Sequence, residues 1–339
     1  MRQFMTNNSK DYNTILLFDT SVVTENLGDF IIMDAVRQQL HEMFPNSFLI
    51  NAPTHDTIGK ETRRWAKKAS YSFVGGTNLL TNRFKGRSHS QWKFGFRDSI
   101  DIAAVGIGLG WGSYKKYDRI MDWPLDVAQS MLYKRSLSTK YLTSVRDSYS
   151  QQRLGAMGIA SINTACVTMW NLTEDRLSVI PKKKADVVVT TITNYWKTPE
   201  YLTAYKKMID LLLNNYRVVK LWVQAREDIE VFAQLHVQDA DRIQFISPSL
   251  TDYDEALSED TDYIGTRLHA GIRALQHQRR TLIVELDNRA HEIAKDTNLP
   301  TVSYKDIESI ANFIHGEREM DIHVPFDKIN QWKQQFLNN

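Results

Sequence analysis

The chain has 339 residues, of which 42% are hydrophobic and 24% charged, and 42 basic against 40 acidic residues leave a net charge of +2. This composition is typical of a globular protein, and the length predicts two domains, because a single core rarely serves more than about 250–300 residues. The basic residues are spread along the chain, so we expect no nucleic-acid partner. The single cysteine, Cys166, excludes an intrachain disulfide and a multi-cysteine zinc site.

The sequence contains no feature that predicts export or membrane insertion. Residues 1–13 are polar and lack the apolar segment of a signal peptide. No run of about 18 apolar residues occurs, so we expect no membrane span. We therefore expect a cytoplasmic protein, which can still work at the inner face of the membrane through peripheral association.

Short apolar runs alternate with amphipathic helical patterns in the first half of the chain. The expected strands are Thr14–Phe18, Phe48–Ile50, Tyr71–Val74, Ile102–Ile107 and Tyr141–Val145. The expected helices are residues 29–44 and Ser148–Gly155, the second capped by Asp147 or Ser148.

A second alternating series begins near residue 180. Its expected strands are Ala185–Thr191, Val218–Val223, Ile243–Ile246, Tyr263–Ile264, Thr281–Glu285 and Thr301–Ser303. Its expected helices are Glu200–Asn214, Arg226–Leu235, Tyr253–Ser258, residues 268–277 and Ala290–Thr297, with two more helical stretches after Lys305.

Alternation of strands and helices predicts an α/β fold with parallel sheets covered on both faces. Two such series predict two Rossmann-like domains whose sheets face a central cleft. We expect an N-terminal domain over residues 1–175 and a C-terminal domain over residues 176–339, with a linker near residues 172–184. The C-terminal helices are expected to pack back on the first domain.

The segment DYIGTRLHAGIRAL, residues 262–275, is the most informative stretch. An apolar run ends at Gly265, and Arg267 and His269 follow where a helical pattern begins. In open α/β folds, ligands bind beyond the carboxyl ends of the strands, and a helix N-terminus favours anions. This grouping predicts an anion site with a titratable acid, although His269 alone also suits a helix cap.

Arg146 follows the fourth strand of the first series and is the second candidate cation. Guanidinium binds carboxylate or phosphate in a bidentate manner and keeps its proton. We expect Arg146 and Arg267 to point into the cleft between the domains and to bind a small polyanion. The alternative for Arg146 is an ion pair with Asp147.

The segment Asn26-Leu27-Gly28-Asp29 follows the first strand. An exposed Asp29 there suits binding or deprotonation of a hydroxyl group. The alternative is that Asp29 caps the helix that follows.

Two glycine turns and one long loop complete the candidate features. The turns, residues 75–78 and 106–110, match neither a complete dinucleotide fingerprint nor a phosphate loop, so we interpret them as close-approach turns beside the cleft. In the loop Thr81–Phe96, Trp92 and Phe94 suit stacking on a sugar. Four basic residues of the loop suit solvent or a lipid-borne phosphate: Arg83, Lys85, Arg87 and His89. An ordinary surface loop is the alternative.

Taken together, these motifs resemble the polysaccharide pyruvyl transferase family. The family's Asn-x-Gly-Asp corresponds to residues 26–29, its Gly-Gly-x-Asn-Leu turn to residues 75–79, and its Arg-Asp pair to residues 146–147. Its most specific element, Gly-x-Arg-Leu-His-Ala, corresponds to residues 265–270. The chain departs from the family pattern at Arg289, where lysine is common, and at residues 165–167, which lack an Asp-Pro pair.

The resemblance implies a GT-B-like fold and transfer of a pyruvyl group from phosphoenolpyruvate to sugar hydroxyls, forming a ketal, in surface or extracellular polysaccharide biosynthesis. It implies His269 as the acid and Asp29 as a candidate base, while the identity of the base stays open. Donor-binding residues would be Arg267, Arg146, Leu268 and Ala270. Acceptor-binding residues would be Asn26, Asn78 and Trp92. The first domain would serve the acceptor, lipid-linked or polymeric, and the second the donor, with no metal and no cofactor beyond the donor substrate.

Two other functions fit parts of the sequence. A GT-B nucleotide-sugar glycosyltransferase is the alternative enzyme, although Glu285 and Glu292 lie seven residues apart rather than at the usual offset of eight. A non-catalytic sugar- or anion-binding relative is the other alternative, and the presence of Arg267 and His269 counts against it.

Overall fold

The computed structural model describes residues 12–81, 91–95, 97–98, 102–112, 114 and 123–337. The chain forms two compact units. The first unit comprises residues 1–24, 32–167 and 325–339, and the second comprises residues 25–31 and 168–324. The segment that carries Asn26 and Asp29 is thus counted with the second unit.

The first unit is built on parallel strands. Its strands are β1 (Asn13–Asp19), β2 (Ser47–Pro53), β3 (Tyr71–Gly75), β4 (Val105–Ile107), β5 (Thr143–Val145) and β6 (Ser161–Asn163). Its helices are α2 (Lys60–Lys68), α4 (Trp123–Ser136), α5 (Ser148–Ala156) and α13 (Phe326–Leu337), together with most of α1 (Leu27–Met43).

The sheet of the first unit has the order β2-β1-β3-β4, and a single bridge between Leu109 and Val145 connects it to the parallel pair β5-β6. In β1, Phe18 pairs with Ala52 on one side and Val74 on the other, and all three are buried. Strands buried on both faces read as continuous apolar runs, which is why β1 was recognisable in the sequence.

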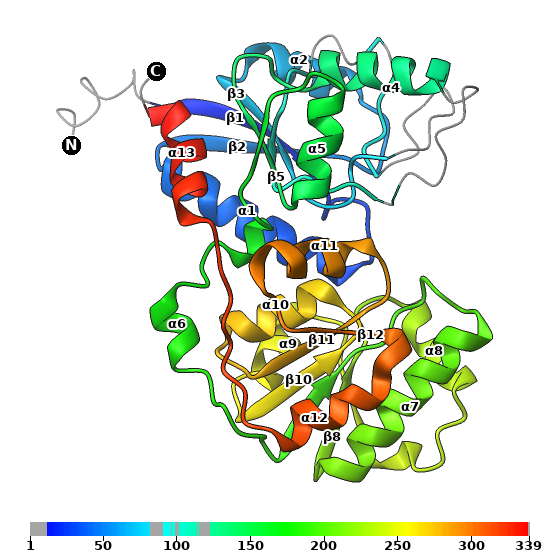
Figure 1. Cartoon of the computed structure of the whole chain (residues 1–339). Helices are drawn as coiled ribbons and strands as arrows, with labels where there is room; N and C mark the ends of the chain where they lie inside the picture. Colours follow the sequence, from blue (N-terminus) through cyan, green and yellow to red (C-terminus); the bar gives the residue numbers. More distant parts are fainter. Residues whose placement is uncertain are drawn as a thin grey trace, which may run out of the picture. The chain divides into compact units, whose positions relative to one another are not determined.

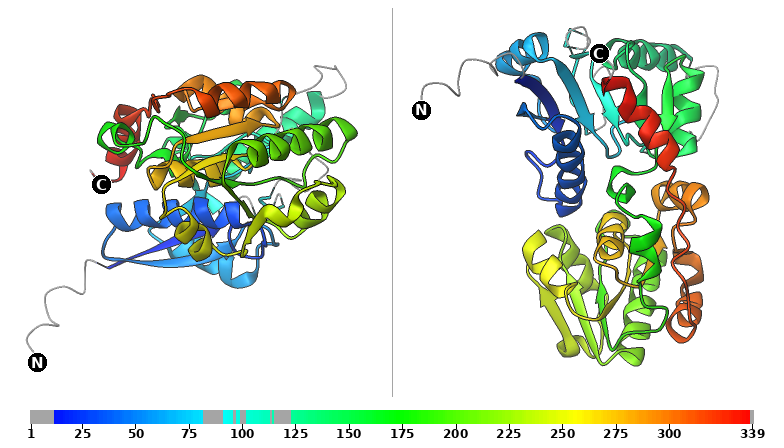
Figure 2. Two further views of the ribbon diagram at one scale, coloured as in Figure 1. Left: turned by 90° about the horizontal axis from the view of Figure 1, so that it is seen from below. Right: turned by 90° about the vertical axis from the view of Figure 1, so that its left-hand side faces the viewer.

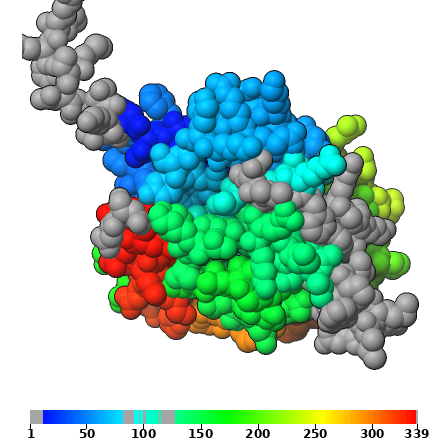
Figure 3. Space-filling view, turned by 90° about the horizontal axis from the view of Figure 1, so that it is seen from above, coloured from blue at the N-terminus to red at the C-terminus, as the bar shows by residue number. Residues whose placement is uncertain are grey.

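Helix α13 belongs to the first unit although it ends the chain. Trp332 Nε1 donates to the carbonyl of Leu142 at 2.8 Å, and the ring of Phe336 lies 5.3 Å from that of Phe73. Figure 3 shows this C-terminal segment, in red, beside blue and green segments of the same unit.

The second unit contains one six-stranded sheet. Its strands are β7 (Val187–Thr190), β8 (Val218–Trp222), β9 (Ile243–Ile246), β10 (Thr261–Gly265), β11 (Thr281–Glu285) and β12 (Thr301–Ser303). Its helices are α6 (Glu174–Ser178), α7 (Pro199–Asn215), α8 (Glu227–Gln234), α9 (Leu250–Ala256), α10 (Leu268–Gln276), α11 (Asn288–Thr297) and α12 (Ile310–His315), with the 3₁₀ turn η4 (Tyr304–Ser309) before α12.

The strands of this sheet are parallel and have the order β12-β11-β10-β7-β8-β9. Helices lie on both faces of the sheet, with α7 and α12 in contact on one face and α10 packed on β10 and β11 (Figures 1 and 2). The strand order reverses direction between β7 and β10, and ligands in open α/β sheets bind at such switch points. The turns that follow β7 and β10 therefore position the candidate site.

The predicted α/β class with parallel sheets is confirmed. Strands β9, β11 and β12 have the predicted bounds, α7 is one residue longer than predicted at each end, and α10 ends one residue earlier than predicted. Helix α1 begins at Leu27 rather than Asp29, because Asn26 Oδ1 accepts from Gly28 N at 3.2 Å and so occupies the capping position. Helix α6 falls inside the expected linker, and α2, α4 and β6 were not predicted.

Within the described residues, no helix has the length and apolar character needed to cross a membrane.

Replacing Trp332 with alanine is expected to destabilise the first unit by about 3–5 kcal/mol, because loss of a fully buried indole leaves a cavity and the Leu142 carbonyl loses one of its two donors, keeping only Gln335 Nε2. Hydrogen exchange measured on peptides from β1 and β3 reports this unit separately. Leu337→Ala is the control, since Leu337 is 64% exposed on the same helix. A loss below about 1 kcal/mol for Trp332→Ala would contradict the packing described.

Asp254 of α9 is expected to stabilise the second unit in a pH-dependent way. Burial raises the pKa of Asp254, but hydrogen bonds from Arg273 and His277 outweigh it and lower the pKa from 3.8 to about 2. Because the folded-state pKa is the lower one, the contribution is present above the unfolded pKa and is lost as pH falls from 3.8 toward 2.

Asp254→Asn should therefore reduce the free energy of unfolding by about 2 kcal/mol at pH 7 and by little at pH 2. Urea denaturation at both pH values measures the difference. The exposed Asp186→Asn should show no such pH dependence, because its partner Arg217 is also on the surface. An equal loss for Asp254→Asn at both pH values would exclude the ionic contribution.

Candidate functional site

Arg267 lies where β10 passes into α10, and the end of β7 fixes its backbone. Its N–H donates to Thr191 Oγ1 at 3.1 Å, and the N–H of Thr266 donates to the Thr191 carbonyl at 3.0 Å. A Cβ atom on Gly265 would lie 2.5 Å from Thr191 Oγ1 and 2.7 Å from Thr191 N. This close approach requires glycine at position 265. Because Thr191 also binds the backbone of Arg267, the glycine and the arginine two residues later are both determined by how the ends of β7 and β10 meet.

The side chain of Arg267 is 3% exposed and is held by two acceptors. Its Nε donates to the Ile192 carbonyl at 3.2 Å, and its Nη2 forms an ion pair with Asp228 Oδ1. Its Nη1 has no hydrogen bond among the described residues. The guanidinium is thus fixed in orientation while one nitrogen remains for a ligand.

Asp228, in the first turn of α8, is a site residue that the sequence analysis missed. It is fully buried, and its two oxygens also accept from the backbone N–H groups of Asn194 and Ala225, each at 3.1 Å. Burial raises the pKa of Asp228, while the Arg267 guanidinium acts in the opposite direction. The one available signal was an acidic residue in the first turn of a predicted helix, and that pattern alone is typical of ordinary helix starts.

His269 occupies the first turn of α10 and is 8% exposed. The N-cap position belongs to Arg267, so His269 does not cap the helix. The neighbours Leu268 and Ala270 are also buried, and the groups they offer at the helix start are their backbone N–H groups, of the kind that suits an anion.

The segment Asn26–Asp29 is anchored within the second unit. Gln224, just beyond β8, donates from Nε2 to Asn26 Oδ1 at 2.8 Å, and its carbonyl accepts from Leu27 N at 3.0 Å. Asn26 Nδ2 in turn donates to Asp29 Oδ2 at 3.2 Å. Asp29 is 1% exposed, so it is a buried carboxylate rather than the exposed one we expected.

Tyr195, in the loop after β7, lies among these residues. Its ring lies 4.7 Å from the Arg267 guanidinium carbon and 5.2 Å from that of Arg289, and its hydroxyl lies 3.4 Å from Asn26 Nδ2. Arg289 is bound by both oxygens of Asp287, the N-cap of α11. Burial lowers the pKa of Arg289, but the negative charge of Asp287, with smaller effects from Tyr195 and Asp29, raises it overall.

The second unit thus contains the predicted polar residues Asn26, Asp29, Arg267 and His269, with the backbone of Leu268 and Ala270 between them in sequence. Three residues that were not predicted as site residues, Tyr195, Asp228 and Arg289, contact members of this set or each other. Each arginine has an acidic partner, so the site combines fixed guanidinium groups with nearly balanced charge. Within the described residues, no group of three or more acidic, histidine or cysteine side chains has the arrangement of a metal site.

The other two predicted polar residues, Asn78 and Arg146, meet within the first unit. Arg146 Nη2 donates to Asn78 Oδ1 at 2.5 Å, and Nε donates to Asp147 Oδ2 at 3.2 Å. Its Nη1 is buried without a partner among the described residues. A Cβ on Gly110 would lie 2.1 Å from the Arg146 guanidinium carbon, which makes Gly110 a close-approach glycine as we inferred.

Trp92 does not offer the stacking surface that we expected. It is fully buried in the core of the first unit, where its ring lies 4.6 Å from that of Phe94 and 5.8 Å from that of Phe18. Both faces of such a core indole are used for packing. The four basic residues predicted to surround it, Arg83, Lys85, Arg87 and His89, lie outside the described residues.

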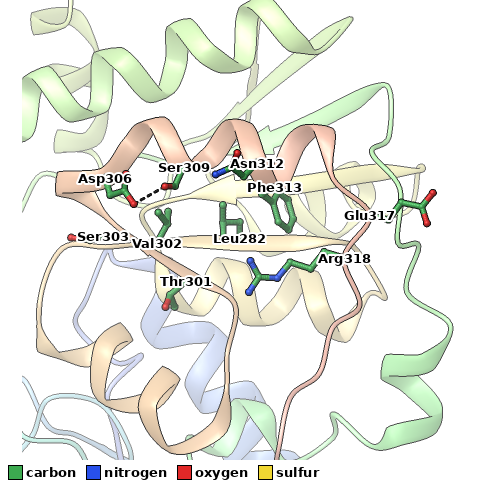
Figure 4. Close-up of a pocket in the computed structure, with 10 residues that line it drawn as sticks. All are labelled: Leu282, Thr301, Val302, Ser303, Asp306, Ser309, Asn312, Phe313, Glu317 and Arg318. Atoms are coloured by element: carbon green, nitrogen blue, oxygen red, sulfur yellow. Dashed lines mark hydrogen bonds between the residues drawn. The ribbon is translucent and has the colours of Figure 1, made fainter.

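A cavity of about 440 Å³ occupies the other end of the second unit and contains none of these residues (Figure 4). Its walls come from β11, β12, η4 and α12, and Ser309 Oγ donates to Asp306 Oδ2 at 2.6 Å within it. Because no predicted site residue lines it, neither Arg146 nor Arg267 among them, we do not assign the candidate site there.

Comparison with solved structures shows which proteins share this fold. The S. aureus MnaA–UDP co-structure matches 95% of this chain and 90% of its own, with a TM-score of 0.51 and 12% identity. A UDP-N-acetylglucosamine 2-epimerase structure from Listeria monocytogenes matches 96% and 91%, with a TM-score of 0.50 and 8% identity. At these identities the likeness shows the fold alone, an α/β fold with parallel sheets that this chain shares with the two structures.

Among curated proteins, none matches this chain. The sequence model of the family described as polysaccharide pyruvyl transferase matches residues 26–288, from the Asn26 segment through the Gly-x-Arg-Leu-His-Ala element to the start of α11. The match covers both units and every residue of the candidate site except Arg289. The chain therefore belongs to the polysaccharide pyruvyl transferase family.

Proposed function

We propose that this protein transfers the pyruvyl group of phosphoenolpyruvate to two hydroxyls of a sugar, forming a cyclic ketal and releasing phosphate. The observation that carries the proposal is the fixed Arg267 guanidinium beside His269 at the N-terminus of α10. Phosphoenolpyruvate carries a phosphate and a carboxylate, and a guanidinium together with helix N–H groups suits both anions.

In the proposed reaction, His269 donates a proton to C3 of phosphoenolpyruvate, which becomes a methyl group and leaves C2 electrophilic. A sugar hydroxyl adds to C2 and gives its proton to a base, for which Asp29 is the candidate. The C2–O bond to phosphate then breaks, a second hydroxyl adds to C2, and its proton leaves with the phosphate. Transfer of the proton from Asp29 back to His269 through solvent restores the enzyme, so the sum is one ketal and one hydrogen phosphate, with no redox change.

Arg146 enters the proposal as a second donor-binding cation, supported by the structure of the first unit alone. Like Arg267, it is fixed through Nε and Nη2 and has an unpaired Nη1. A buried N–H without an acceptor costs free energy, so a ligand oxygen would relieve it. Asn78 accepts a hydrogen bond from Arg146 and so positions it. In this proposal Asn78 therefore acts through Arg146, whereas the sequence predicted that it contacts the acceptor directly.

The proposed donor also suggests where the protein works. Phosphoenolpyruvate is an intracellular metabolite, so we propose that the reaction takes place in the cytoplasm, on an acceptor made there or held at the inner face of the membrane. Polysaccharide biosynthesis is the setting that agrees with the family.

Arg267→Lys should weaken phosphoenolpyruvate binding about tenfold or more. The guanidinium binds Ile192 and Asp228 through two nitrogens and keeps a third for a ligand, and the single ammonium group of lysine cannot do both. Calorimetric titration with phosphoenolpyruvate measures the affinity, and parallel titrations with UDP-sugars test the glycosyltransferase alternative. The matched control is Arg242→Lys, an exposed arginine of the same unit that should leave binding unchanged.

Arg267→Ala would leave Asp228 as an unpaired buried charge, so its folding is at risk. The double variant Arg267→Met with Asp228→Asn removes the pair while keeping the site neutral, and it should fold and lose donor binding. Wild-type affinity for phosphoenolpyruvate in either Arg267→Lys or the double variant would contradict the donor assignment, and binding of a UDP-sugar instead would favour the glycosyltransferase.

His269→Ala is expected to lower turnover by about 10²–10⁴-fold while keeping donor affinity, because it removes the acid and leaves Arg267 in place. Phosphate release from phosphoenolpyruvate in the presence of a sugar acceptor measures turnover. His323→Ala, an exposed histidine of the same unit, is the control. Full activity in His269→Ala would remove His269 from the chemistry.

A further inference from the structure

The described part of the second unit has three strongly exposed aromatic side chains, Tyr195, Trp196 and Phe245. Phe245 lies on the edge strand β9. Tyr195 and Trp196 lie together in the loop after β7, and Tyr195 contacts both Arg267 and Arg289. The exposed aromatic surface beside the candidate site is therefore formed by this loop, whereas the tryptophan expected from sequence, Trp92, is buried.

Trp196 begins a stack of three aromatic rings. Its ring lies 5.4 Å from that of Tyr201 at an interplanar angle of 17°, and Tyr201 lies 4.2 Å from Tyr304 at 21°. Tyr201 also donates from its hydroxyl to the Leu286 carbonyl at 3.4 Å. The stack therefore joins α7 to the segments that follow β11 and β12, and it holds Trp196 from behind while 39% of Trp196 stays exposed.

A cavity of about 360 Å³ adjoins the far end of this stack. Tyr304 forms part of its wall together with the apolar Ala204 and Ile307, and the polar lining residues are Glu200, Thr203, Lys207, Lys305 and Glu308. Its two acids and two lysines balance, and Lys207 Nζ already bonds Glu308 Oε1 at 3.0 Å. The surface thus consists of flat rings followed by a neutral, hydrogen-bonding hollow.

We propose that Trp196, Tyr201, Tyr304 and this cavity form a subsite for a neutral saccharide, which binds the acceptor glycan beyond the sugar unit that reacts. The C–H face of a pyranose ring is apolar and flat, so it displaces water from an exposed indole. The hydroxyls at its edge match the mixed donors and acceptors of the cavity. The inference rests on the proposed function only in that the acceptor is a sugar.

The balanced charges of the cavity walls favour a neutral ligand over an anionic one. A phosphate or carboxylate needs an uncompensated cation, and the cationic groups on the cavity walls, Lys207 and Lys305, are matched by Glu200 and Glu308. A nucleobase can also stack on an indole, and it would bring a diphosphate with it. Competition by UDP distinguishes the two ligands.

The test is saturation-transfer NMR on the full-length protein with named probes. These are the methyl glycosides of glucose, galactose and N-acetylglucosamine, together with cellobiose and lactose. Saturating the aromatic protons should transfer magnetisation to the ring C–H protons of at least one probe. The disaccharides test whether a second sugar unit adds to the binding of the first.

Trp196→Ala should weaken binding of the responding probe about tenfold, and Trp196→Phe should retain most of it, since an aromatic face remains. Phe245→Ala is the matched control, an exposed aromatic residue of the same unit on the edge strand β9, and should change nothing. Trp196 is exposed, so its loss should leave the fold intact. An unchanged signal in Trp196→Ala, no signal with any probe, or displacement of the sugar by UDP would overturn the subsite.

Calorimetry with phosphoenolpyruvate keeps the two proposals separable. Trp196→Ala should bind phosphoenolpyruvate as the wild type does, because the ring that contacts Arg267 is that of Tyr195, which the variant keeps. Trp196-dependent sugar binding without phosphoenolpyruvate binding would uphold the subsite and refute the donor. Arg267-dependent phosphoenolpyruvate binding without sugar binding would do the reverse.

Discussion

The ion pair between Arg267 and Asp228 is the interaction on which the candidate site depends. It joins the turn after β10 to the start of α8, and the same carboxylate accepts the backbone N–H of Asn194 in the loop after β7. Three segments at the carboxyl edge of one sheet are thereby fixed to a single buried charge. Breaking one partner of such a pair leaves the other uncompensated, so the arrangement is costly to disturb.

This organisation explains how a nearly neutral group of side chains can be suited to an anion. Arg267 and Arg289 are each compensated by an acid, which spares the folded protein the repulsion of two bare guanidiniums. What remains for a ligand is a set of hydrogen-bond donors with fixed orientation, namely one guanidinium nitrogen and the N–H groups of a helix start. Groups that are already oriented lose little entropy when a ligand binds, and this preorganisation is a large part of what sites of this kind provide.

The sequence was sufficient for the fold and for the part of the site that is local in sequence. Buried parallel strands such as β11 are continuous apolar runs, and their bounds could be predicted to the residue. The short strand β6 and the helices α2 and α4 were missed, and α2 has no buried residue that would give it an apolar stripe. The Gly-x-Arg-Leu-His element needed only its own residues to be recognised.

The rest of the site depends on contacts between distant segments. Asp228 meets Arg267 across 39 positions, and Tyr195 meets Asn26 across 169, so no local pattern marks either as a site residue. Trp92 shows the opposite error, a residue predicted to bind ligand that is buried instead. Its burial results from packing against Phe18 and Phe94, and the composition of the loop does not reveal that packing. Asp29 was displaced from the capping position by Asn26, a competition between two good capping residues three positions apart.

The assignment of α13 to the first unit affects the order in which the protein can be made. Residues 168–324, the bulk of the second unit, leave the ribosome as one continuous stretch, and that unit can bury its sheet as soon as β12 has been synthesised. The first unit is begun earlier but stays incomplete until α13 has emerged, because Trp332 and Phe336 fill part of its aromatic core. During translation, the half of the protein that is synthesised first is therefore the half that is completed last.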